Sequence, residues 1–154
     1  MASYGTSAGV AALCKHLTPA GDWSETSGPS SAQATAWLEK GYSDINIRLA
    51  QSGYISPETD TTILCYAMLQ HLNDLYAAAF AEQAWNVARG EAEEETRGRH
   101  YMTEYRRGIA ELLAGDGTLL GLTLSSTARP RRRLRMANLR REDGYSVFTE
   151  DSGL

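Results

Sequence analysis

Apolar side chains recur at helical spacing in four stretches of this sequence, and turn-forming residues separate the stretches. The first stretch can be capped by Thr6 or Ser7, and Thr18-Pro19 predicts its end, because the residue before a proline disfavours the helical conformation. A loop rich in Gly, Ser, Thr and Pro follows. The apolar positions of this short helix are Val10, Leu13, Cys14 and Leu17.

The second stretch starts with a signal for the beginning of a helix. Ser30 and Gln33 have the spacing of a capping box, in which each side chain bonds the backbone N–H of the other residue. The helix is predicted to run to about Gln51, and Gly53 stands where a left-handed residue commonly ends a helix. Its predicted buried face consists of Ala34, Trp37, Leu38, Gly41, Ile45 and Leu49.

The third stretch predicts a long helix from Pro57 to about Arg89. Ser56 can cap it, Pro57 suits the first helical position, and the acids Glu58 and Asp60 suit the positive end of the helix dipole. Such a helix would span roughly 50 Å, so we expect it either to kink or to be covered partly by a neighbouring subunit. Its apolar stripe consists of Cys65, Met68, Leu69, Leu72, Tyr76, Ala79, Phe80 and Val87, while His71, Asp74 and Glu82 lie away from the stripe's centre.

The fourth stretch predicts a helix that follows Gly90, begins with the acidic residues 91–95 and ends at Gly115. Its apolar face consists of Tyr101, Met102, Tyr105, Ile109, Leu112 and Leu113. Beyond it the pattern predicts a short extended piece at residues 119–124, a linker, a basic stretch and a second short strand at residues 145–149. The predicted fold is all-α: a small bundle of about four helices with one long central helix, residues 1–116, and an extended C-terminal arm, residues 117–154.

The length of 154 residues fits one domain, and 42% hydrophobic and 22% charged residues are ordinary for a globular protein. Residues 1–12 lack the basic and apolar regions of a signal peptide, and no apolar run approaches the roughly 20 residues of a membrane helix. We therefore expect no secretion and no membrane contact. Cys14 and Cys65 are not in CxxC spacing and lie on apolar helix faces, which favours buried free thiols and a reducing compartment.

The net charge of −4 is the sum of three blocks of different sign. Residues 1–128 contain 8 basic and 15 acidic side chains and sum to −7, residues 129–141 contain 7 arginines and no acid, and residues 142–154 contain 4 acids and no base. A basic block of this kind cannot bury itself in a core. It is therefore typical of an arm that contacts another molecule.

No motif for catalysis, a cofactor or a metal ion is evident. His16, His71 and His100 lack paired ligand spacing, and the acidic residues 91–95 lack the glycine and alternating ligands of a calcium loop. The sequence also contains no GxSxG, P-loop or GxGxxG motif. We therefore expect that the protein is not an enzyme, has no catalytic residues and binds no cofactor or metal ion.

The aromatic residues lie mostly at helical spacing, so we expect them in the core or at a subunit contact rather than on a base-stacking platform. Tyr42, Tyr54 and Trp85 lie beside the apolar stripes, which makes them candidates for a protein interface. The aromatic residues expected to pack are Trp37, Tyr66, Tyr76, Phe80, Trp85, Tyr101 and Tyr105.

The arginine block allows three interpretations. It can neutralise phosphates of a nucleic acid, although it contains no base-reading motif and follows an acidic body. It can dock on acidic grooves of a protein through forked guanidinium contacts, which is the interpretation we favour. It can also be a solvated tail without a specific role.

The organisation of residues 4–116 resembles the head-to-tail adaptor, or head-completion, proteins of tailed bacteriophages. The features that match are a short capped N-terminal helix, a Ser/Thr-rich loop, the helix Ala34-Thr-Ala-Trp37-Leu38 continuing to Gly53, and Ser56-Pro57 before a long helix. The Tyr101-x-x-x-Tyr105-x-x-x-Ile109-x-x-Leu112 helix that ends at Gly115 completes the match. These are features of pattern and not a signature motif.

The resemblance implies a structural virion protein of the neck, assembled in the host cytoplasm. Such adaptors form a homo-oligomeric ring, commonly a dodecamer, beneath the portal protein, extend the channel for packaged DNA, and present a surface to a stopper or tail-completion protein. In this family the segment after the last helix tends to bind the portal. By position and charge, the portal-binding residues are predicted to be Arg129, Arg131, Arg132, Arg133, Arg135, Arg140, Arg141, Tyr145 and Phe148.

The runner-up is a small helical DNA-binding regulator that grips phosphates with the arginine arm. Gly53 and Ser56 would then mark the turn of a helix-turn-helix. The predicted following helix is too long for an ordinary recognition helix, and its acidic first turn would repel phosphate.

Overall fold

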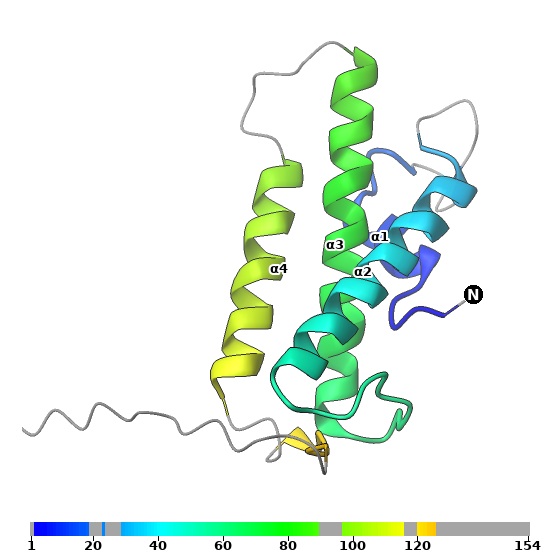
Figure 1. Ribbon diagram of the computed structural model, residues 1–154. Helices are drawn as coiled ribbons and strands as arrows, with labels where there is room; N and C mark the ends of the chain where they lie inside the picture. The colour runs from blue at the N-terminus through cyan, green and yellow to red at the C-terminus, as the bar shows by residue number, and fades with distance from the viewer. Residues whose placement is uncertain (1, 19–22, 24–28, 90–96, 116–119, 126–154) are drawn as a thin grey trace, which may run out of the picture.

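The computed structural model describes residues 2–18, 23, 29–89, 97–115 and 120–125, and these residues form four α-helices and no strand (Figure 1). The helices are α1 (Ser7–Leu13), α2 (Ser31–Gln51), α3 (Leu64–Arg89) and α4 (Arg97–Ala114). The other three helices all pack on α3, which is the longest (Figure 1). The predicted all-α bundle of about four helices with one long central helix is therefore confirmed.

The predicted helix caps are confirmed where the signal is local. The Thr6 hydroxyl accepts from the N–H of Gly9 at 3.0 Å, and Ser30 and Gln33 form the capping box of α2. Gly53 has a φ of 88°, in the left-handed region that ends a helix. At the end of α4, the N–H of Gly115 bonds the carbonyl oxygen of Glu111 at 2.9 Å.

The first helix ends earlier than predicted. α1 stops at Leu13, and residues 14–17 form a turn instead of a further helical turn. The Thr18 hydroxyl donates to the carbonyl oxygens of Ala11 and Cys14, at 3.1 and 3.2 Å, which closes this turn against the helix. Leu17 is still buried, so the apolar pattern correctly predicted its environment but not its backbone conformation.

The predicted start of α3 is wrong, because the helix begins at Leu64 and not at Pro57. Ser56 does not cap it; its hydroxyl is bonded to the carbonyl oxygen and the side-chain Oδ1 of Asn46, at 3.1 and 2.8 Å. The Glu58 carboxylate accepts from the next two backbone N–H groups, at 2.9 Å each. Such local side-chain bonds offer the backbone an alternative to the helix.

Two clusters of buried side chains form the core. The larger joins α2, α3 and α4 with the N-terminal segment and residues 120–125; its members are Tyr4, Ile45, Leu49, Tyr54, Cys65, Leu69, Leu72, Leu75, Tyr105, Ile109, Leu112 and Leu122. The smaller joins α1 to α2 and α3 through Val10, Cys14, Leu17, Leu38, Ala77, Ala78 and Ala81. Both cysteines are buried free thiols, as predicted. The seven aromatic residues expected to pack do pack on these clusters or on each other.

Small residues allow α4 to approach α3 closely. A Cβ atom added at Gly98 would lie 2.8 Å from the backbone carbonyl oxygen of Ala79. A Cβ atom added at Gly108 would lie 2.6 Å from Cδ2 of Leu72, the end of a side chain that can rotate. The first contact is therefore rigid and the second can adjust.

Three residues that the sequence placed outside the core are buried. Tyr54 and Asp74 are each 8% exposed and Glu82 is 2% exposed. The single-stripe pattern was wrong for the two acids because α1 packs on α3 as well as α2 and α4, so that more than one face of α3 is covered. Tyr42 and Trp85, the other two interface candidates, are half-buried.

Candidate functional site

The end of the bundle from which the C-terminal arm continues is built by two segments far apart in the sequence. Residues 53–55 after α2 pair with residues 123–125 through an isolated antiparallel bridge between Tyr54 and Leu124. The N–H of Ile55 donates to the carbonyl oxygen of Thr123 at 2.7 Å, and that of Ser125 donates to the carbonyl oxygen of Gly53 at 2.8 Å. The last described residue is therefore fixed to the bundle.

Of the predicted extended piece at residues 119–124, the structure describes residues 120–124, and these contain one bridged residue, Leu124. Gly121, with a φ of 95°, lies in a turn, and a Cβ atom there would be 2.8 Å from Cβ of Ile63. After this turn, Leu122 enters the larger core cluster and is 2% exposed. The non-local contacts of Gly121 and Leu122 explain why a regular strand does not form.

This end of the bundle exposes large apolar side chains. Ile55 is 48% exposed, Leu124 is 53% exposed and Leu64, the first residue of α3, is 78% exposed. We name these three residues the arm-exit patch. Ile55 and Leu124 lie on the two paired segments, and Leu64 follows Ile63, which lies beside Gly121. Neighbouring exposed apolar side chains of this kind fit a contact surface.

The predicted portal-binding residues, Arg129 to Phe148, all follow Ser125 and lie outside the described residues. The acidic run at residues 91–95, which we predicted at the start of the fourth helix, also lies outside the described residues. The described residues therefore include only the base of the arm. The sequence did not predict the arm-exit patch, since it depends on a pairing between residues about 70 positions apart.

The N-terminal segment is anchored on α3 by two buried polar side chains. The Asn73 Oδ1 accepts from the N–H groups of Tyr4 and Gly5, at 2.9 and 3.1 Å, while its Nδ2 donates to the carbonyl oxygen of Leu38 at 2.9 Å. The Asp74 carboxylate accepts from the N–H of Thr6 at 2.9 Å. Burial raises the pKa of Asp74 to about 6, although the Thr6 bond favours its charged form.

A second polar network joins α3, α4 and the turn after α1. Arg97 Nη1 lies 2.9 Å from His16 Nδ1, and His16 Nε2 lies 3.1 Å from Oε2 of Glu82. Because a guanidinium can only donate, Nδ1 accepts and the Nε2–H donates to the carboxylate. Glu82 Oε1 has no hydrogen-bond partner among the described residues. This network fixes the start of α4 beside the end of α1.

A third contact ties α2 to α4. The Tyr105 hydroxyl of α4 donates to Oδ2 of Asp44, and Arg48 Nε donates to the same oxygen at 2.7 Å. Tyr76 packs edge-on against the Tyr105 ring, with centroids 5.2 Å apart. The two helices otherwise pack mainly on α3.

The buried carboxylates of Asp74 and Glu82 bond groups on other segments, and the buried Cys14 thiol stays neutral. Burial, with a smaller contribution from the Glu82 carboxylate, raises the pKa of the Cys14 thiol to about 12, so that the thiolate is not populated at neutral pH. Among the described residues, no three His, Cys, Asp or Glu side chains are grouped to hold a metal ion. Within the same residues, no helix is both long and apolar enough to cross a membrane.

Asn73, Asp74 and Glu82 are the structurally important residues that sequence reasoning missed. The available signal was a polar pair, Asn73-Asp74, between Leu72 and Leu75 on a helix that is otherwise rich in alanine and leucine. Comparisons of the chain with protein-family models, with curated proteins and with solved structures find no match.

Proposed function

We propose that the protein is a structural virion component: a ring-forming adaptor between the portal and the tail or stopper of a tailed bacteriophage. The observation that carries the proposal is the base of the arm. The bridge between Tyr54 and Leu124 holds residues 123–125 at one end of the helical bundle, beside the exposed apolar arm-exit patch, and the seven arginines of residues 129–141 follow in the sequence. An adaptor needs such an end to bind one axial partner and leave its other surfaces for neighbouring subunits.

The arginine block supplies the contact with the portal in this proposal. Guanidinium groups make forked, charge-assisted hydrogen bonds with carboxylates, so that Arg131, Arg132, Arg133 and Arg135 suit an acidic groove of the portal. Each contact is modest, but a ring presents many copies at once, and the high effective concentration increases the overall affinity. The block before residue 129 sums to −7, and a net negative body would oppose adhesion of packaged DNA to the ring.

The long central helix supports subunit packing. In Figure 1 the last turns of α3 extend beyond the start of α4, and Val87 in these turns is 68% exposed. Trp85 is half-buried in the same segment. An apolar helix end of this kind fits a contact with a neighbouring subunit.

The runner-up function, a DNA-binding regulator, is favoured by the arginine charge alone. The connection between α2 and α3 spans residues 52–63, whereas a helix-turn-helix uses a turn of about three or four residues. The pair α2 and α3 therefore does not form that motif. A phosphate-gripping arm remains as an outcome of the test.

The test is a docking measurement with purified portal assemblies from the same source. Full-length protein should sediment with the portal, protein lacking residues 129–154 should not, and replacement of Arg131, Arg132, Arg133 and Arg135 by Ser should abolish docking. A control variant replaces three exposed basic residues of the bundle by Ser and should retain docking; these are Lys15, Lys40 and Arg107. Failure to dock, combined with tight binding of duplex DNA at physiological salt, would contradict the proposal.

A further inference from the structure

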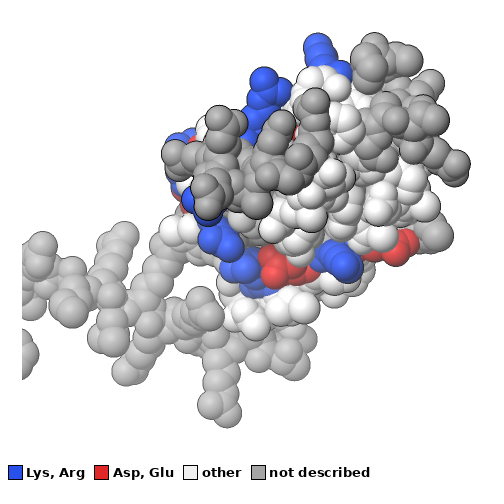
Figure 2. Space-filling view, turned by 90° about the horizontal axis from the view of Figure 1, so that it is seen from above, with Lys and Arg blue, Asp and Glu red and all other residues white. Residues whose placement is uncertain are grey.

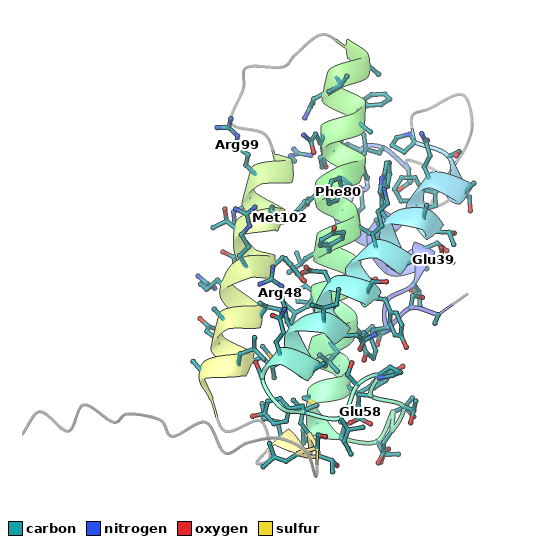
Figure 3. The ribbon with its side chains drawn as sticks, viewed as in Figure 1. Glu39, Arg48, Glu58, Phe80, Arg99 and Met102 are labelled. Atoms are coloured by element: carbon teal, nitrogen blue, oxygen red, sulfur yellow. The ribbon has the colours of Figure 1, made fainter. Side chains whose placement is uncertain are left out.

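The surface between α2 and α4 combines basic and half-buried apolar side chains. Arg99, Met102 and Arg106 follow one another at spacings of three and four residues, so they lie on one flank of α4. In Figure 3, Met102 of α4 lies between Phe80 of α3 and Arg99, which projects from the side of α4 away from α3, and Arg48 reaches from α2 toward α4. We name Tyr76, Phe80, Arg99, Met102 and Arg106 the basic strip.

The floor of the strip is aromatic. Tyr76 and Phe80 are in contact, with ring centroids 5.0 Å apart, and both are half-buried. The same stripe of α3 is fully buried one to two turns earlier, at Leu69 and Leu72. The junction of α2 and α4 through Asp44 lies beside Tyr76, whose ring packs on Tyr105. Beyond that junction the stripe becomes partly uncovered.

The rim of the strip is positive. Arg99 and Arg106 are exposed and form no ion pair among the described residues, while Arg107 on the other flank is paired with Glu104 and Glu111. Asp44, the acid on this side of α2, is already paired with Arg48. Figure 2 shows basic side chains on the left of the molecule, the side of α4 in Figure 1, and others along its lower and upper edges. The strip therefore suits a ligand with acidic and apolar groups.

Residues 142–154 of the same chain have this composition. They contain four acids and no base, and Tyr145, Val147 and Phe148 lie between the acidic pairs at 142–143 and 150–151. The 20 residues from Ser125 to Tyr145 can span up to roughly 66 Å, and α3 with its 26 residues is about 39 Å long. The arm can therefore return from its exit to the strip.

We propose that the acidic end of the arm, residues 142–154, docks on the basic strip of its own bundle, with Tyr145 and Phe148 on the aromatic floor and the acids beside Arg99 and Arg106. The tether makes this contact intramolecular and raises its effective concentration to the millimolar range. It goes beyond the portal contact, because it needs no portal and assigns Tyr145 and Phe148 to the bundle. The arginine block would then be a loop held at both ends.

A loop held at both ends loses less conformational freedom when it binds. Its cost of ordering on a partner is therefore lower than that of a free arm. The docked acidic end would in this way prepare the arginines for binding, and would also keep its own acids away from them.

The test uses the full-length protein without portal, with a photo-crosslinking amino acid in place of Phe148. Crosslinked peptides are mapped by mass spectrometry in a mixture of isotopically light and heavy protein. We expect crosslinks to the segments around Phe80 and Met102, within chains of one isotope label. Crosslinks elsewhere on the bundle, crosslinks only between differently labelled chains, or none, would overturn the proposal.

Charge reversal separates specific docking from chance contact. The double variant Arg99→Glu and Arg106→Glu should reduce the crosslink yield about fivefold or more, since two attractive pairs become repulsive. Arg107→Glu on the other flank of α4 is the matched control and should leave the yield unchanged. Adding Glu142→Arg and Asp143→Arg to the double variant should restore it. Equal yields in all variants would refute the charge complementarity, whatever the portal docking result.

Discussion

Replacement of Asp74 by Asn should stabilise the protein at neutral pH and have little effect in acid. The residue is 8% exposed and the pKa of its carboxyl group is raised from 3.8 to about 6 by burial, so the folded protein disfavours the charged form. The folded state therefore binds more protons than the unfolded state between these two pKa values, and stability falls as the pH rises through this window. At pH values above this window, burial of the charged Asp74 carboxylate lowers the free energy of unfolding by about 3 kcal/mol.

The asparagine side chain in the Asp74→Asn variant keeps an oxygen that can accept from the N–H of Thr6, and it carries no charge at any pH. Urea unfolding of both proteins should therefore give a difference in the free energy of unfolding of about 3 kcal/mol at pH 7 and about 0.5 kcal/mol at pH 4. Asp60→Asn is the control. Asp60 is exposed and its hydrogen bonds with Thr62 lower its pKa, so this variant should not be more stable than the wild type at pH 7. A difference between wild type and Asp74→Asn that does not change with pH would refute the burial argument.

Two further pairs of substitutions and one chemical modification test the packing. Gly98→Ala should lower the free energy of unfolding by about 1–3 kcal/mol, because the added methyl group meets a backbone carbonyl, whereas Gly108→Ala should be tolerated because it meets only a rotatable leucine. Urea unfolding of both variants measures this, and equal losses would contradict it. Tyr105→Phe should cost about 1–2 kcal/mol through loss of its buried hydroxyl bond, and Tyr76→Phe close to nothing; equal costs would count against the tie between α2 and α4. Cys14 should react with a thiol reagent at pH 8 only after unfolding, as a kinetic absorbance assay can show; fast reaction of the native protein would contradict its burial.

Helix ends could be predicted from the sequence where the signal and its partner are close together. Thr6, Ser30 with Gln33, and Gly53 each act on residues within one turn, so a short window of sequence contains the whole interaction. The start of α3 could not be predicted in this way. Its expected cap, Ser56, bonds Asn46 of the preceding helix, and the choice between the two partners depends on how the chain folds back.

The buried polar residues could not be predicted either, because their partners are far away in the sequence. The partners of Asp74 and Glu82 are Thr6 and His16, which are 68 and 66 positions away in the sequence. A helical stripe cannot reveal such partners, and it places a charged residue in solvent by default. The charge of the arm, in contrast, is readable because it depends on composition alone. The contact between the start of the arm and the bundle cannot be predicted from the sequence, since Leu124 and Tyr54 meet only in the folded protein.

We propose that this bundle is a ring adaptor whose arm binds a portal. Electron cryo-microscopy of portal assemblies mixed with the full-length protein tests it most directly. We expect a closed ring of helical bundles coaxial with the portal, each with the end that contains Ile55, Leu64 and Leu124 toward the portal. Portal particles without added density, in the presence of excess folded protein, would contradict it.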